Sequence, residues 1–126
     1  MDPQIPGFDQ IDLTESFVLA CDQTSDALIF SLELVLAPSH PLYRSPPAGI
    51  AYCYVNAKLI FPSLTQVLWE RKTFQPFFDA ADSVDYGNID TFSLEAPGVF
   101  RLTGDWGEVQ IWSKAPFVEI DAVSLE

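Results

Sequence analysis

The stretch that decides the fold reads Ala27-Leu28-Ile29-Phe30-Ser31-Leu32-Glu33-Leu34-Val35-Leu36. Large apolar residues occupy every second position, so in an extended chain they lie on one face, while Ser31 and Glu33 lie on the other. An α-helix turns by about 100° per residue and would spread the same side chains around its circumference. The two-residue period therefore predicts a β-strand with one buried face.

The segment Gly49–Phe61 shows the same alternation. Its residues from Ala51 to Phe61 are apolar or small at every second position, whereas the intervening set carries Tyr52 and Tyr54 and is expected to face water. Clusters of turn residues separate these two strands from others. The further predicted strands are Ser16–Asp22, Leu64–Lys72, Ile89–Glu95, Val99–Thr103, Glu108–Ser113 and Phe117–Ala122.

Short turns link the last four predicted strands, at residues 96–98, 104–107 and 114–116. Short turns make flanking strands neighbours, so an antiparallel meander is expected there. Eight short strands in 126 residues predict a single all-β domain, an antiparallel sandwich or barrel. Residues 1–15 are expected to form an extended N-terminal arm, and at most one short helix is expected, a single turn within Phe74–Ala81.

One segment, residues 63–72, fits either a strand or a helix. Ser63-Leu64-Thr65-Gln66 has the form of a helix capping box, and Leu64, Val67 and Leu68 are spaced for a helix. The same residues also alternate as a strand would, with Val67 and Trp69 on one face. The alternation favours the strand and leaves the helix as the alternative.

The net charge of −12 is concentrated in two stretches without Lys or Arg. Residues 1–26 hold six acids and residues 79–95 hold five, so these stretches account for 11 of the 12 excess negative charges. Such a surface repels nucleic acids and anionic membranes, whereas it attracts a basic protein. The pattern predicts a non-catalytic module that binds a basic protein, as a toxin-neutralising immunity protein does. The alternative is that the charge only keeps an aromatic-rich domain soluble.

The second acidic stretch is also dense in oxygen ligands of the kind that calcium prefers. Its spacing differs from that of an EF-hand, so Asx-turns in a solvated loop are the simpler interpretation. The candidate calcium ligands are Asp79, Asp82, Asp85, Asn88 and Asp90.

The loop from Pro38 to Pro47 contains four prolines, which stiffen it and exclude a central strand. It carries the only histidine of the chain, and His40, Tyr43 and Arg44 are candidate residues of a binding lip. A polyproline-like crossover between sheets is the simpler interpretation and is favoured over the binding lip.

Trp106 lies at the tip of a predicted hairpin, beside Asp105 and ahead of the strand that ends near Trp112. If exposed, Trp106 offers a stacking platform for a sugar or an anchor for a protein, and Asp105 and Trp112 are further binding candidates. If it folds back over the core, it holds the turn in place instead.

No sequence motif of a hydrolase elbow, a nucleotide loop or a zinc protease occurs, and no cofactor is predicted. The remaining enzymatic alternative is a small hydrolase with a carboxylate pair, in which Glu33 is the acid because its strand is strongly apolar. Cys21 and Cys53 are expected to be buried small hydrophobes. The chain shows no signal segment and no apolar run long enough for a bilayer, so a cytoplasmic protein is expected.

Overall fold

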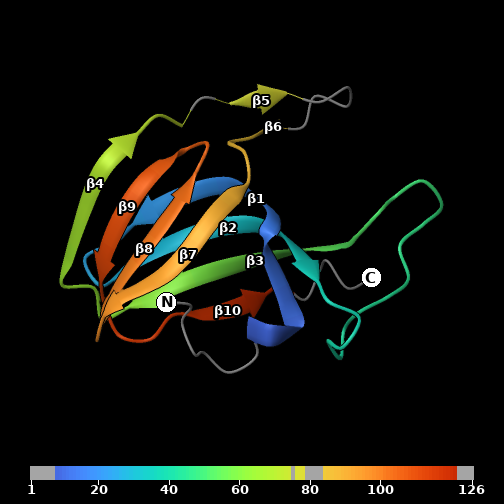
Figure 1. Cartoon of the computed structure of the whole chain (residues 1–126), viewed down its shortest axis with the longest axis horizontal. Helices are drawn as coiled ribbons and strands as arrows, with labels where there is room; N and C mark the ends of the chain where they lie inside the picture. The colour runs from blue at the N-terminus through green and yellow to red at the C-terminus, as the bar shows by residue number, and fades with distance from the viewer. Residues whose placement is uncertain (1–7, 75, 79–83, 122–126) are drawn as a thin grey trace.

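The computed structural model describes residues 8–74, 76–78 and 84–121, most of which lie in β-strands (Figure 1). Two four-stranded antiparallel sheets pack on each other, with strand orders β1-β2-β3-β10 and β4-β9-β8-β7. This confirms the prediction of an all-β sandwich. The strands of the sheets are β1 (Ile11–Gln23), β2 (Ala27–Leu36), β3 (Cys53–Pro62), β4 (Gln66–Lys72), β7 (Ile89–Ala96), β8 (Val99–Gly104), β9 (Gly107–Trp112) and β10 (Phe117–Ile120).

The core lies between the two sheets and follows the predicted alternation. On β2, the five residues at even positions from Leu28 to Leu36 are at most 2% exposed. An unbroken ladder joins β2 to β3, from Ala27 opposite Pro62 to Leu36 opposite Cys53, so both strands present their apolar faces together. The remaining core residues of β3 and of the facing sheet include Val55, Ala57, Leu59, Phe61, Leu102, Val109 and Ile111.

β1 begins earlier than the sequence indicates. It starts at Ile11, after a 3-10 turn η1 (Phe8–Gln10), so the expected arm is wrong for residues 11–15. Asp12 lies opposite Val35 of β2, but the next paired residue is Phe17, and four residues of β1 stand against one of β2. A bulge of this size removes the two-residue period, which explains why the sequence does not reveal the strand there.

The ambiguous segment forms a strand. β4 pairs with β9, and the backbone N–H and the hydroxyl of Thr65 both donate to the carbonyl of Trp112, at 2.9 and 3.2 Å. The helical turn expected within residues 74–81 is wrong where the structure describes it. Residues 77–78 form the short strand β5 (Phe77–Phe78), which pairs with β6 (Val84–Asp85), and residues 75 and 79–81 lie outside the described part.

Two further boundaries differ from the sequence prediction. β3 begins at Cys53, because residues 49–52 belong to the preceding loop, where Gly49 has a φ of 86°. The turn at 114–116 does not continue the meander: β10 crosses to the other sheet and pairs with β3, Phe117 lying opposite Ile60. A short turn limits how far the chain travels but does not fix the sheet that it joins. Within the described residues, no helix has the length and apolarity needed to cross a membrane.

Candidate functional site

The two acidic stretches meet at one edge of the sandwich. The backbone of Val18 in β1 accepts a hydrogen bond from the N–H of Tyr86, at 2.8 Å, and its own N–H donates to the carbonyl of Gly87, at 2.9 Å. An isolated β-bridge joins Phe17 to Asn88 next to this pair. β1 therefore lies beside the start of β7, as Figure 1 shows, although about 70 residues separate the two segments in the chain.

Polar side chains extend this contact. The hydroxyl of Thr14 donates to the carboxylate of Asp12, at 2.9 Å. The side-chain amide of Asn88 donates to the carbonyl of Thr14, at 3.5 Å, and to the carboxylate of Asp90, at 3.3 Å. These donors are neutral and leave the negative charges in place. We call the set formed by Asp12, Glu15, Asp85 and Asp90 the acidic edge.

An aromatic face adjoins the acidic edge on the outer side of the first sheet. The ring of Tyr54 lies 6.2 Å from that of Phe17 and 6.1 Å from that of Tyr52, measured between centroids. Desolvation raises the pKa of the Tyr54 phenol, and the negative charges of Glu33 and Glu15 raise it further. The negative potential of the edge thus reaches the aromatic face, which we define as Phe17, Tyr52 and Tyr54.

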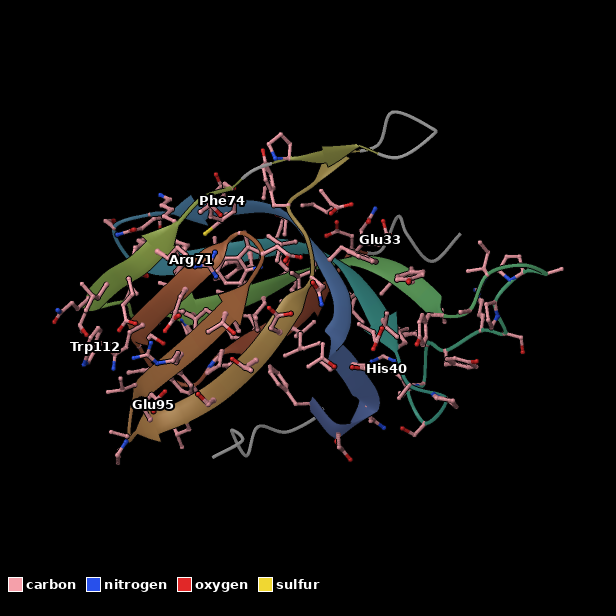
Figure 2. The ribbon with its side chains drawn as sticks, turned by 45° about the horizontal axis from the view of Figure 1, so that its top comes forward. Glu33, His40, Arg71, Phe74, Glu95 and Trp112 are labelled. Carbon is pink, nitrogen blue, oxygen red and sulfur yellow. The ribbon has the colours of Figure 1, made fainter. Side chains whose placement is uncertain are left out.

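Glu33 lies on the outward side of β2, opposite Phe17 on β1 and Asn56 on β3. It is half-buried, on the same side of the strand as Ser31. Figure 2 shows it beside β1. The carboxylate proposed for a hydrolase is therefore next to the acidic edge and the aromatic face.

Three glutamates on the second sheet differ from the acidic edge, because they share a cation. Arg101 on β8 forms ion pairs with Glu70, at 2.7 Å, with Glu95, at 2.9 Å, and with Glu108. The hydrogen bond from Arg101 lowers the pKa of the Glu70 carboxyl. Glu95 thus belongs to the second acidic stretch by sequence, but it is ion-paired, whereas Asp85 and Asp90 accept hydrogen bonds from neutral donors.

The candidate calcium ligands are only partly placed. Asp85 accepts a hydrogen bond from the N–H of Gly87, at 2.8 Å, which is an Asx-turn, and Asn88 bonds Asp90 as described above. Among the residues with described positions, no three His, Cys, Asp or Glu side chains gather around a common point for a metal. Asp79 and Asp82 lie outside the described residues.

Trp106 folds back into the core and is fully buried, which contradicts the exposed stacking platform. The end of β4 holds the hairpin tip in place. Arg71 donates to the carbonyl of Gly104, at 3.0 Å, and the hydroxyl of Thr73 donates to that of Asp105, at 2.9 Å. The backbone N–H groups of Thr73 and Phe74 donate to the carbonyl of Trp106, at 2.9 and 3.1 Å. The carbonyls of Gly104, Asp105 and Trp106 are thus all bonded, and the indole is directed inward.

The other binding candidates are not brought together. Trp112 is half-buried on the second sheet, and Figure 2 shows it well away from His40. In the proline-rich loop, Nδ1 of His40 accepts a hydrogen bond from the N–H of Leu42, at 3.0 Å, and the His40 carbonyl accepts one from the N–H of Tyr43, also at 3.0 Å. His40 and Tyr43 therefore shape the loop, and Tyr43 packs against the core.

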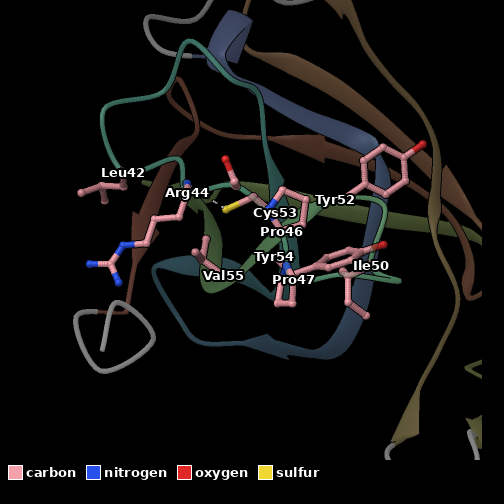
Figure 3. Close-up of a pocket in the computed structure, with 10 residues that line it drawn as sticks. Leu42, Arg44, Pro46, Pro47, Ile50, Tyr52, Cys53, Tyr54 and Val55 are labelled. Carbon is pink, nitrogen blue, oxygen red and sulfur yellow. Dashed lines mark hydrogen bonds between the residues drawn. The ribbon is translucent and has the colours of Figure 1, made fainter.

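A pocket of about 380 Å³ lies between this loop and the start of β3 (Figure 3). Of the earlier candidates with described positions, Arg44 alone lines it. The alternation predicts that Tyr52 and Tyr54 face water, but it does not predict that the loop folds over them. Its lining residues are Leu42, Arg44, Ser45, Pro46, Pro47, Ile50, Tyr52, Cys53, Tyr54 and Val55.

The two cysteines are free, half-buried and far apart. Cys21 lies opposite Phe30 and Cys53 opposite Leu36, six residues apart along β2, a separation of about 20 Å in a strand. Burial raises the pKa of the Cys21 thiol to about 12, so this thiol is unreactive at neutral pH. Both side chains pack against the core as small hydrophobes but are only half-buried, and Cys53 also lines the pocket.

Two features of the described residues are thus suited to binding: the acidic edge with its aromatic face, and the pocket under the loop. They lie close to each other, because Tyr52 and Tyr54 belong to both. No family model, curated protein or solved structure gives a significant match to this chain.

Proposed function

We propose that this chain is a non-catalytic binding module that engages a basic protein through the acidic edge and the aromatic face. The observation that carries the proposal is the contact between β1 and the segment before β7. It brings together acids from two stretches that contain no base. Carboxylates gathered in this way attract a cationic surface over a longer range than any single pair does.

The chemistry of the two surfaces is complementary to Lys and Arg side chains. Asp12, Asp85 and Asp90 each accept a hydrogen bond from a neutral donor, so they keep their charge for a partner. The rings of Phe17 and Tyr54 offer faces on which a cation is attracted by the ring quadrupole. Carboxylates beside aromatic rings therefore favour a basic partner over a neutral one.

A titration with hexalysine, followed by the amide resonances of the labelled protein, tests the proposal. At 20 mM NaCl we expect the largest shifts at residues 12–18 and 85–90, because the peptide binds where the negative potential is strongest. At 300 mM NaCl the shifts should largely disappear, because screening weakens long-range attraction.

Two matched double variants separate a local surface from net charge alone. Asp85→Asn with Asp90→Asn removes two charges from the acidic edge and keeps the oxygen that accepts each hydrogen bond. Asp22→Asn with Asp26→Asn removes two charges from the far end of β1 and the turn after it. Only the first pair should weaken hexalysine binding several-fold. Equal losses in both variants, or shifts spread evenly over the surface, would contradict the proposal.

The same variants can be used to identify the basic partner. The parent protein, immobilised at low salt, should retain basic proteins from a native lysate, and the Asp85/Asp90 variant should retain markedly less of them than the Asp22/Asp26 variant. Retention of the same proteins by both variants would mean that capture is non-specific.

A further inference from the structure

The pocket under the proline-rich loop is distinct in chemistry from the acidic edge. Figure 3 shows Leu42 and Arg44 on one side of it and Ile50 and Tyr52 on the other. Its volume of about 380 Å³ falls in the range of small-molecule sites. We propose that the pocket binds a small apolar molecule with one anionic group, of which a carboxylate is the simplest.

The apolar part of the ligand follows from the lining. Leu42, Ile50 and Tyr52 are 38%, 49% and 39% exposed, and they are three of the five large apolar side chains that stand out as exposed among the described residues. Covering such side chains is favourable in proportion to the apolar area removed from water. Pro46 and Pro47 have no N–H, so this wall offers few donors to a polar ligand.

The anionic group follows from the charge of the lining. The chain holds 18 acids and six Lys or Arg residues, yet among the residues that the structure describes no acid lines this pocket and one arginine does. Elsewhere Arg101 is occupied by three carboxylates and Arg71 by backbone carbonyls. Within the described part of the chain, no residue is recorded as a partner of the Arg44 guanidinium, which is exposed.

The position of Arg44 is fixed by its backbone. Its N–H donates to Sγ of Cys53, at 3.5 Å, which joins the loop to the first residue of β3 (dashed line in Figure 3). The guanidinium extends from this point toward the outside of the pocket. The anionic group would therefore lie at the rim, with the apolar part of the ligand against Ile50 and the tyrosines. A guanidinium binds a carboxylate through two parallel hydrogen bonds.

Calorimetric titration with 2-naphthoate and with 2-naphthamide tests this inference. The two molecules have the same rings, but only the first is charged. We expect saturable one-to-one binding of 2-naphthoate that weakens about 5- to 10-fold in Arg44→Gln, because the charge-assisted contact is lost at a solvent-exposed rim. Binding of 2-naphthamide should change less than two-fold in that variant, and Ile50→Ser should weaken binding of both molecules.

Lys114→Gln is the matched control, since it removes one exposed cation far from the pocket lining. The side chains of Arg44 and Lys114 are both exposed, so the melting temperature should be unchanged in both variants. The inference is overturned if 2-naphthoate shows no saturable binding, or if Arg44→Gln and Lys114→Gln weaken it equally. The proposed function does not rely on Arg44, so failure here leaves it standing.

Discussion

The Ser16 hydroxyl completes the backbone ladder where β1 bulges away from β2. It donates to the carbonyl of Asp12, at 2.7 Å, and accepts from the N–H of Val35, at 2.9 Å. Ser16 is fully buried, so water cannot replace it. Ser16→Ala leaves the buried N–H of Val35 and the part-buried carbonyl of Asp12 without this partner, and should lower the free energy of unfolding by about 2–4 kcal/mol. Urea denaturation measures this change.

Ser31→Ala provides the comparison at the same scale. Ser31 lies on the outward side of β2, and its hydroxyl makes no hydrogen bond that is recorded within the described residues. Its removal should cost less than about 0.5 kcal/mol, as is usual for outward positions. Similar losses for the two serines would show that the Ser16 hydroxyl does not bridge the bulge.

Trp106 shows how much of a single residue's role the sequence can predict. Its place at a hairpin tip is readable from Gly104 and Gly107, which flank it. The direction of its indole, into the core, depends on hydrogen-bond donors from Arg71 and Thr73, which lie more than 30 residues earlier in the chain. A tip whose carbonyls are bonded by another strand cannot be distinguished from an open one by local composition.

At the scale of elements, Gly87 determines how closely the segment before β7 approaches the turn between β8 and β9. It has a φ of 98°, and a Cβ at this position would lie 2.5 Å from the Cβ and a carboxylate oxygen of Asp105. Gly87→Ala therefore introduces backbone strain and a steric clash, which together should cost about 2–4 kcal/mol. The amide of Val18, which donates to Gly87, should lose protection from hydrogen exchange.

Gly49→Ala isolates the strain from the clash. Gly49 has a similar φ of 86°, but a Cβ there would meet no atom within 4 Å. Its substitution should cost only the conformational strain, about 1–2 kcal/mol. If the two variants are equally stable, Asp105 does not restrict this position.

The sequence predicts most elements but not how they combine. Alternation identifies β2 and β3 because each buries one face along its length. It fails at the bulged start of β1, where side chains no longer alternate. It also cannot assign β10, because a short turn does not say which sheet comes next. The acidic edge and the pocket both depend on contacts between segments that are far apart in the sequence or joined by a long loop. The acidic edge forms where β1 meets β7, and the pocket forms where the proline-rich loop lies against β3.

At the scale of the whole molecule, the net charge of −12 works against the folded state through self-repulsion. The three ion pairs of Arg101 work in the opposite direction. Raising NaCl from 0.02 to 0.5 M shortens the screening length from about 20 Å to about 4 Å. It therefore weakens both effects, and the repulsion, which acts over longer distances, should weaken more.

Two acids on β7 make this balance measurable. Asp90 belongs to the acidic edge and its recorded partner is neutral, whereas Glu95 is paired with Arg101. At 0.02 M NaCl, Asp90→Asn should raise the melting temperature and Glu95→Gln should lower it. Each shift in melting temperature corresponds to a change of less than about 1 kcal/mol in the free energy of unfolding, as for other exposed charges.

At 0.5 M NaCl the two variants should converge on the parent, since screening removes the term in which they differ. A stabilised Asp90→Asn that also loses hexalysine binding would mean that the chain keeps an unfavourable charge at the surface where it binds. Two results would contradict the inference that repulsion at the acidic edge destabilises the fold. One is a melting temperature of the parent that falls as salt is added. The other is an Asp90→Asn variant that is less stable than Glu95→Gln. The negative charge of Asp90 would then stabilise the fold, and binding of a cationic partner would not be needed to explain its presence.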